Sequence, residues 1–401
     1  MSQKTNYPIS SLVQNMSESA TLKMAQFARE LKAQGHDVIS LSIGQPDFET
    51  PEYIKAAVAE ALREGYTQYT PVPGLLELRE AICTKFKRDN GLIFSPDQIV
   101  VSTGAKQALH NLFMALLDEE DEVIIFSPHW VSYSDIIGLT KATPKFLFAG
   151  IDQDYKVKPA QLADAITDRT KLIIFSSPCN PTGSVYLAHE LEALANVIGS
   201  QEGIYVISDE IYEHINFVGT HSSIGTFDTV KDRTITVNGF SKGFAMTGWR
   251  LGYIGAPHLI AQACVKHQSQ VTSGANAFAQ KAAITALLED MSPTLAMKQA
   301  YMKRRDLVVE LLARIPNLIV NRPQGAFYIF PDISYFMGKR IEETLIQNSA
   351  DFCEYMLKQA HVALVPGSAF GAEGYFRMSY AASEDQLREA IRRIKLALEG
   401  V

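Results

Sequence analysis

Short apolar runs alternate with amphipathic stretches through the middle of the chain. Stretches such as AKQALHNLFMALL and HELEALANVIG have helical periodicity and separate several of these runs. Most of the runs are rich in β-branched or aromatic residues, and all are predicted to be strands, at residues 98–102, 122–126, 145–148, 171–175, 204–208, 234–237 and 251–255. Apolar strands that alternate with helices predict an α/β fold with a mostly parallel seven-stranded sheet, covered by helices on both faces.

The two ends of the chain have a different pattern. Residues 17–34 are predicted to form a helix and residues 38–44 a strand. After a long helical region, the segments GAFYIF, HVALVP and FRMSY have the pattern of strands, and the motif SEDQ at 383–386 is a capping box for a final helix. We therefore predict a smaller α+β domain from both chain ends, residues 1–50 and 291–401, and a large domain from residues 51–290.

The composition narrows the class of protein. The 401 residues are enough for two packed domains, and 47% hydrophobic with 20% charged residues suits a folded chain. A net charge of -7 without a long basic run argues against binding of nucleic acid or a membrane surface. Four scattered cysteines fit free thiols, and neither a signal peptide nor a membrane-spanning run is evident, so we expect a cytoplasmic protein.

Polar motifs follow three of the predicted strands at the point where each strand ends. They are CNPTG at 179–183, DEIY at 209–212 and NGFSK at 238–242, and Arg250 lies eight residues beyond the last of them. Each motif alone is common in turns and helix starts. Because the carboxyl ends of parallel strands meet at one edge of a sheet, their joint occurrence predicts one shared site there.

Motifs along nearly the whole chain carry a family resemblance. They include SIGQPDFETP, YTPVPGLLELREAI, STGAKQALHNL, SPHWVSYSD, SPCNPTGSVY, VISDEIYEHI, NGFSKGFAMTGWRLGYIG, PQGAFYIF and VALVPGSAFG. In this order they resemble the motifs of the pyridoxal 5′-phosphate (PLP)-dependent class I aminotransferases of fold type I. The likeness is greatest to the bacterial and archaeal branch of aspartate aminotransferases. The resemblance implies a PLP enzyme that acts on small amino and keto acids.

The resemblance assigns a role to each polar residue expected around the cofactor. Lys242 matches the lysine that forms a Schiff base with PLP and then moves a proton, and Asp209 matches the carboxylate that pairs with the pyridine nitrogen. Tyr212 and Asn180 match the donors to the phenolic oxygen, while Glu210 is expected to be structural. The remaining cofactor contacts are expected from Gly104, Ala105, Lys106, Trp130, Ser241 and Arg250.

Substrate recognition is expected to depend on two cations. Arg377 resembles the arginine that binds the α-carboxylate bidentately, and Gly44, Asn180 and Trp130 are expected beside it. Lys106 stands where this branch places a lysine for a second carboxylate. The resemblance therefore implies transfer of an amino group from L-aspartate to 2-oxoglutarate, giving oxaloacetate and L-glutamate by a ping-pong mechanism.

Two further expectations come from the family. Tyr69 resembles the tyrosine that reaches the phosphate in the neighbouring subunit, so a homodimer is expected in which each site is built by two chains. Members that also accept prephenate carry a basic residue where this chain has Ser17 followed by Glu18. That departure argues against prephenate as a substrate.

Other functions remain compatible with parts of the pattern. Fold type I also includes β-lyases and aminotransferases with aromatic, alanine or kynurenine donors, and these share the same lysine, aspartate, tyrosine and asparagine. A DNA-binding regulator is disfavoured because the family pattern begins within the first twenty or so residues. No metal site is expected, since the nine histidines are dispersed and no HExxH motif occurs.

Overall fold

The large part of the chain is built on a seven-stranded sheet. In the computed structural model, which describes residues 9–14, 16 and 20–399, its strands lie where the apolar runs predict them. They are β2 (Ile99–Ser102), β3 (Glu122–Ser127), β4 (Thr143–Phe148), β5 (Thr170–Ser176), β6 (Tyr205–Asp209), β7 (Thr234–Gly239) and β8 (Gly252–Gly255). The order across the sheet is β2-β8-β7-β6-β5-β3-β4, and every pair is parallel except the two that β8 makes. The predicted mostly parallel sheet is confirmed.

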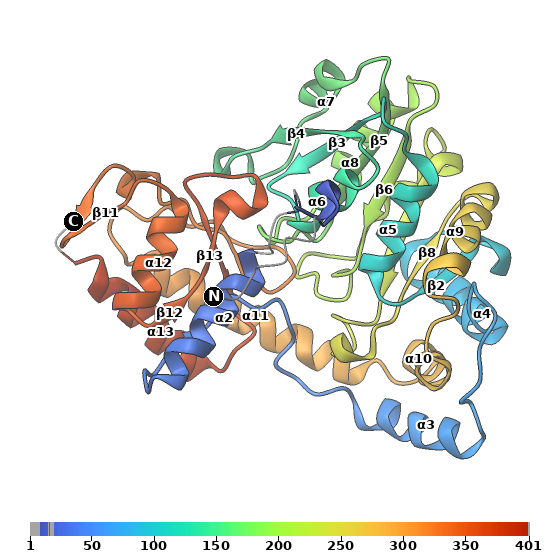
Figure 1. The fold of residues 1–401 in the computed structure, drawn as a ribbon, viewed down its shortest axis with the longest axis horizontal. Coiled ribbons are helices and arrows are strands. Elements are labelled where there is room, and N and C mark those ends of the chain that lie inside the picture. Colours follow the sequence, from blue (N-terminus) through green and yellow to red (C-terminus); the bar gives the residue numbers. More distant parts are fainter. Residues whose placement is uncertain (1–8, 15, 17–19, 400–401) are drawn as a thin grey trace, which may run out of the picture.

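Helices cover both faces of this sheet because its strands are apolar on both sides. On β5, Leu172 and Ile174 pack into one core and Ile173 and Phe175 into another. The first core is closed by α5 (Ala105–Leu116), α6 (Ser132–Gly138) and α9 (His258–Val271), and the second by α7 (Pro159–Ala165) and α8 (Ala188–Gly199). Near β2 the sheet packs against α4 (Leu76–Lys85) and α10 (Ala277–Leu288), and α3 (Glu52–Arg63) packs on the outside of α10 (Figure 1).

The strand directions bring the predicted site residues to one edge of the sheet. The parallel strands β3, β5, β6 and β7 all end there, and β2 points the same way because β8 is antiparallel to both β2 and β7. Since β8 runs in the opposite direction, the residues just before it, including Arg250, lie at this same edge. Loops that leave this edge are where ligands bind in open α/β sheets.

The smaller part of the molecule combines both ends of the chain. A parallel pair joins β1 (Ile39–Ser40) to β12 (Val362–Ala363), and a second sheet has the order β13-β14-β9, where β9 is Tyr328–Ile329, β13 is Val365–Pro366 and β14 is Phe376–Ser379. The other elements are α1 (Ser11–Gln14), α2 (Ala20–Ala33), α11 (Ser292–Leu312), α12 (Ser349–Gln359), α13 (Glu384–Ala397), β10 (Arg340–Ile341) and β11 (Thr344–Leu345). In Figure 1 the blue helix α2 lies against the red C-terminal elements. The predicted smaller α+β unit from both chain ends is confirmed, and the exact boundaries at 50/51 and 290/291 stay a prediction.

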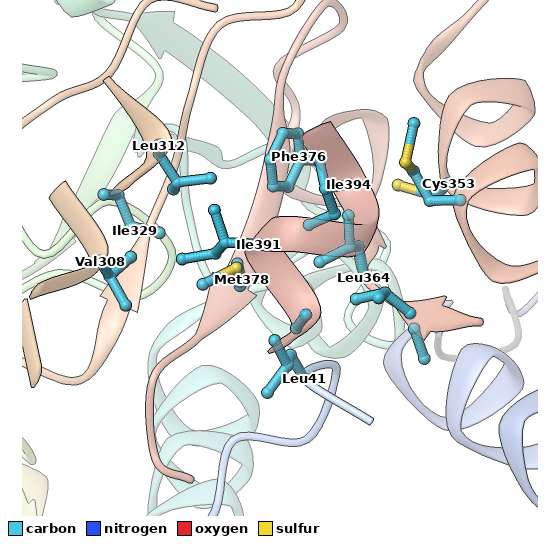
Figure 2. Packing of buried hydrophobic residues seen from close by; sticks show 14 of the residues in the cluster. Leu41, Val308, Leu312, Ile329, Cys353, Leu364, Phe376, Met378, Ile391 and Ile394 are labelled. Atoms are coloured by element: carbon cyan, nitrogen blue, oxygen red, sulfur yellow. The ribbon is translucent and has the colours of Figure 1, made fainter. Parts of the chain in front are cut away.

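One apolar core holds this smaller unit together. Figure 2 shows Leu41 from the N-terminal segment packing with Val308 and Leu312 of α11 and with Ile391 and Ile394 of α13. All five side chains are buried. The capping box that begins α13 is present, with the Ser383 hydroxyl accepting from the backbone N–H of Gln386.

The predicted strand at 38–44 is shorter in the structure than in the sequence. Only Ile39 and Ser40 pair as a strand, because backbone carbonyl groups beyond them accept hydrogen bonds from side chains instead of from another strand. The Ser42 carbonyl accepts from Arg377, and the Gly44 carbonyl accepts from Lys242. None of the helices within the described residues is long and apolar enough to cross a lipid bilayer.

Candidate functional site

A cavity of about 330 Å³ lies at the carboxyl edge of the large sheet, beside the smaller unit. Its lining draws on loops after β2, β3, β5, β6 and β7 and on β9 and β14. Of the residues predicted for the site, the cavity is lined by Gly44, Ala105, Lys106, Trp130, Asn180, Asp209, Tyr212, Ser241, Lys242, Arg250 and Arg377. The structure therefore brings almost all of the predicted site residues together.

Asp209, the last residue of β6, places a buried carboxylate in this cavity. Its Oδ2 accepts from the Tyr133 hydroxyl at 2.7 Å, and its Oδ1 accepts from the Ile211 backbone N–H at 3.2 Å. Burial raises the pKa of Asp209 to about 6, although the hydrogen bond from Tyr133 and the charge of Lys242 act in the opposite direction. This carboxylate would be stabilised by a cationic group placed against it.

Lys242 lies just beyond the end of β7, and its half-buried side chain brings the amine near Asp209. The Nζ atom donates to the Gly44 carbonyl at 2.5 Å. Burial lowers the pKa of Lys242 to about 7, and the positive charges of Arg377 and Arg250 add to this effect. A large fraction of the amine is therefore neutral near pH 7, which lets it act as a nucleophile or as a base.

Arg377 is a buried guanidinium on β14. Its Nη1 donates to Asn180 Oδ1 at 2.9 Å and its Nη2 to the Ser42 carbonyl at 2.6 Å, while Nε has no partner among the described residues. No carboxylate in ranges 9–14, 16 and 20–399 lies within 4.0 Å of it. A buried cation without a counter-ion is costly, so this position suits an anionic ligand.

The start of α5 forms a second place for an anion. Gly104, the residue before the helix, has φ +85°, and a Cβ atom there would come within 2.5 Å of Arg250 Nη2. Arg250 is held by donation from its Nη1 to the Thr247 carbonyl at 2.9 Å. The first N–H groups of any helix lack partners within the helix, so they and the guanidinium can bind a phosphate together. Gly104 does not line the cavity, but Ala105 beside it does.

Lys106 adds a third cation to the cavity. Its Nζ lies 5.0 Å from the centre of the Trp130 ring. Burial lowers the pKa of Lys106, and the charge of Arg250 contributes in the same direction. Lys106 and Arg377 thus come to one cavity from different elements, one from α5 and the other from β14.

Two tyrosines of the site were not predicted from the sequence. Tyr133 binds Asp209, and the hydroxyl of Tyr328 shares a hydrogen bond of 2.7 Å with the hydroxyl of Tyr212. Tyr133 lies at the start of α6, three residues after Trp130. Its nearness in sequence to a predicted site residue was the one signal that could have identified it. Tyr328 lies in the apolar segment GAFYIF, where an aromatic residue is indistinguishable from an ordinary core residue.

Glu210, expected to be structural, faces away from the cavity into a buried charged cluster. Its Oε2 accepts from Asn90, His221 and Ser223, and Lys85 forms an ion pair with the adjacent Glu213. Glu210, Glu213 and His221 lie close enough to ligate a metal ion. However, the Lys85 ammonium already supplies positive charge to this cluster. Burial alone would lower the pKa of His221, but the charge and hydrogen bond of Glu210 together with the charge of Glu213 outweigh burial, so the pKa is raised.

Besides Gly104, three more predicted residues lie outside the cavity or outside the described residues. Tyr69 is 98% exposed and lies in a surface hollow formed by residues 66–70 and 274–278. It is not among the residues that line the candidate site of its own chain. Ser17 and Glu18, on which the expectation about prephenate depends, fall outside the residues that the structure describes.

Comparisons with known proteins find similarity along nearly the whole chain. Residues 36–394 match the family described as aminotransferase class I and II. The chain is 44% identical over 390 residues to an aspartate/prephenate aminotransferase of Nitrosomonas europaea, which covers 96% of this chain and 98% of the relative. Among solved structures, the aspartate aminotransferase from Rhizobium meliloti has a TM-score of 0.95 at 40% identity, covering 98% of this chain and 99% of that one. The Thermus thermophilus aspartate aminotransferase with maleate has a TM-score of 0.92 at 41% identity, with 98% and 100% covered.

Proposed function

Because the chain belongs to the class I and II aminotransferase family and is an aminotransferase, we propose that it moves the amino group of L-aspartate to 2-oxoglutarate. The products are oxaloacetate and L-glutamate, and the cofactor is PLP. The observation that carries the proposal is that two cations, Lys106 and Arg377, line the same cavity as the Lys242 amine. A dicarboxylic amino acid needs two such cations.

The residues of the cavity fit PLP. The guanidinium of Arg250 and the start of α5 suit its phosphate, and the buried carboxylate of Asp209 suits a protonated pyridine nitrogen. Trp130 offers a ring face, and Asn180 and Tyr212 offer donors for the phenolic oxygen. Ser241, next to Lys242, lines the same cavity. When bound, PLP supplies an electron sink that weakens the bond between hydrogen and the α-carbon of an amino acid.

The chain's own groups then bind the substrate and move its proton. Arg377 holds the α-carboxylate, with Asn180 and the Gly44 segment beside it, and Lys106 holds the distal carboxylate. The Lys242 amine, with its pKa lowered to about 7, is suited to take the α-proton and return it at neutral pH. Because donor and acceptor use the same cavity in turn, the keto acid product leaves before 2-oxoglutarate binds, which is a ping-pong mechanism.

A panel of amino donors with 2-oxoglutarate tests the proposed substrates. We expect L-aspartate to give the largest kcat/KM, and initial rates at several fixed concentrations of 2-oxoglutarate to give parallel double-reciprocal lines. Preference for an aromatic amino acid, alanine or kynurenine would contradict the proposed donor. Release of pyruvate and ammonia without transfer would indicate a β-lyase. Prephenate belongs in the panel as an acceptor, and we expect it to be poor because of Ser17 and Glu18.

Replacing Lys106 with alanine is expected to impair dicarboxylic substrates selectively. Loss of one partner of a buried charge pair costs about 2–5 kcal/mol, so KM for aspartate is expected to rise about 30-fold or more. KM for alanine is expected to change by less than about threefold, since alanine has no distal carboxylate. Steady-state kinetics with both donors measure the difference.

The matched control for this substitution is Lys339→Ala. Lys339 also lies over an aromatic ring, that of Tyr335, but it does not line the cavity. We expect this variant to keep the wild-type KM for both donors. An equal rise in KM for aspartate and alanine in the Lys106→Ala variant would remove the assigned role of Lys106.

We further propose a homodimer in which Tyr69 serves the site of the neighbouring subunit. The 98% exposure of this tyrosine supports a role outside its own chain. A hydrogen bond to a charged group contributes about 1.5–3 kcal/mol, so Tyr69→Phe is expected to weaken PLP binding about 10-fold or more. Fluorescence titration of the apo-protein with PLP measures this, with Tyr335→Phe, another exposed tyrosine, as the control. A fully active monomer at low protein concentration would refute the shared site.

A further inference from the structure

Tyr328 is a buried side chain that contacts three of the proposed site residues at once. Its hydroxyl shares the 2.7 Å hydrogen bond with the Tyr212 hydroxyl, and the Arg377 guanidinium lies 4.5 Å above its ring centre. Its hydroxyl also lies against Gly44, where a Cβ atom would come within 2.3 Å of it. Tyr328 therefore touches groups proposed to bind the cofactor, the α-carboxylate and the Lys242 amine.

The register of the small sheet fixes this position. Ser379 of β14 lies opposite Tyr328 of β9 in an antiparallel pair. Arg377 is two residues from Ser379, so it is the diagonal neighbour of Tyr328 on the same face of the sheet. Tyr212, in contrast, follows β6 of the large sheet. The hydrogen bond between the two tyrosines thus joins the smaller unit to the large one inside the cavity.

We propose that Tyr328 is a positioning residue that orients the Tyr212 hydroxyl toward the cofactor and supports the Arg377 guanidinium from below. The proposal rests on the proposed PLP-dependent function. Tyr212 has a single hydroxyl proton. When Tyr212 donates it to the phenolic oxygen of PLP, its own oxygen is left to accept from Tyr328. A hydroxyl that accepts a hydrogen bond becomes a stronger donor, so Tyr328 increases the stabilisation of negative charge on the phenolic oxygen.

Other charged groups around the pair do not replace this hydrogen bond. The Lys242 amine lies 5.6 Å from the Tyr212 ring centre, Arg377 lies over Tyr328, and Asp209 is near Tyr212. All three are retained when only the Tyr328 hydroxyl is removed. The ring of Tyr328 offers its π-face to Arg377, a contact that a phenylalanine preserves and an aliphatic residue does not.

Tyr328→Phe removes the hydroxyl and tests the first half of the proposal. The readout is the pH midpoint of the visible absorbance change of the PLP-bound protein. Without the Tyr328 hydroxyl, negative charge on the phenolic oxygen of PLP is less stable. The proton whose loss changes the absorbance is therefore released only at higher pH, and the midpoint is expected to rise by about 0.5 pH units. KM for aspartate is expected to change by less than about twofold, since the ring beneath Arg377 remains.

Tyr380→Phe is the matched control for this experiment. Tyr380 is equally buried and its hydroxyl donates one hydrogen bond, to the Ala326 carbonyl at 3.2 Å, but it does not line the cavity. The absorbance midpoint of the Tyr380→Phe variant is expected to equal that of the wild type. An unchanged midpoint in Tyr328→Phe would overturn the proposal, as would an equal shift in both variants. A wild-type protein without any PLP absorbance would instead contradict the proposed function itself.

Tyr328→Leu tests the second half of the proposal. Loss of the π-face beneath the Arg377 guanidinium is expected to raise KM for aspartate about 3- to 10-fold beyond that of Tyr328→Phe. The absorbance midpoints of the two variants are expected to agree. Equal KM values for Tyr328→Phe and Tyr328→Leu would remove the role of the ring.

Discussion

A Lys242→Ala variant is expected to lose about 10⁴-fold in kcat for aspartate. The amine is the one group of the cavity with its pKa lowered to about 7, and a positioned acid–base group contributes up to about 10⁴-fold. Removal of the amine also removes the proposed covalent attachment of PLP. Single-turnover mixing of the PLP-bound variant with aspartate measures the remaining rate.

Stability measurements separate this chemical loss from misfolding. The charge of the half-buried Lys242 amine is disfavoured by its surroundings, so its replacement by alanine removes a destabilising group. We expect the PLP-free variant to unfold at the same temperature as the PLP-free wild type or above it. A variant that unfolds normally but keeps kcat within tenfold of the wild type would contradict the role of Lys242.

An Asp209→Asn variant is expected to lose about 10²- to 10³-fold in kcat while it still binds PLP. Asparagine has the shape of aspartate and can keep a contact with Tyr133, but it lacks the charge that holds a proton on the pyridine nitrogen. Removal of one preorganised electrostatic partner in an active site costs about 2.7–4 kcal/mol in the transition state. Steady-state kinetics at saturating PLP measure this loss.

The adjacent carboxylate provides the control for Asp209. Glu210→Gln changes a buried carboxylate that faces Asn90, His221 and Ser223 instead of the cavity. We expect this variant to unfold at a lower temperature because Asn90, His221 and Ser223 lose their shared anionic acceptor, while kcat stays within about threefold of the wild type. Similar losses of kcat in both variants would mean that the charge of Asp209 has no specific role.

Much of the fold was predictable because its signals are local. Most strands of the large sheet are short apolar runs rich in β-branched or aromatic residues, and such runs predict strands from local sequence alone. The site was predictable for the same reason, since Asp209 ends its strand and Asn180 and Lys242 lie in the loops after theirs, and these strands end at one edge. These positions depend on strand direction and little else.

The parts that were missed depend on contacts between distant segments. The strand predicted at 38–44 stops at Ser40 because carbonyl groups beyond it accept from Lys242 and Arg377. Lysine is a residue type that is almost always exposed, yet Lys85 is completely buried because Glu213 and Asn90 bind its ammonium group. Tyr328 joins the site only through pairing of β9 with β14, and no local pattern in the sequence reports that pairing.

Reduction of the PLP-bound protein with borohydride, followed by peptide mass spectrometry, tests the central claim most directly. If Lys242 carries the cofactor, a single peptide that contains this lysine gains the mass of the reduced pyridoxyl group, and the Lys242→Ala variant gives no labelled peptide. Label on another lysine, such as Lys106, or a protein that remains unlabelled when saturated with PLP, would contradict the account.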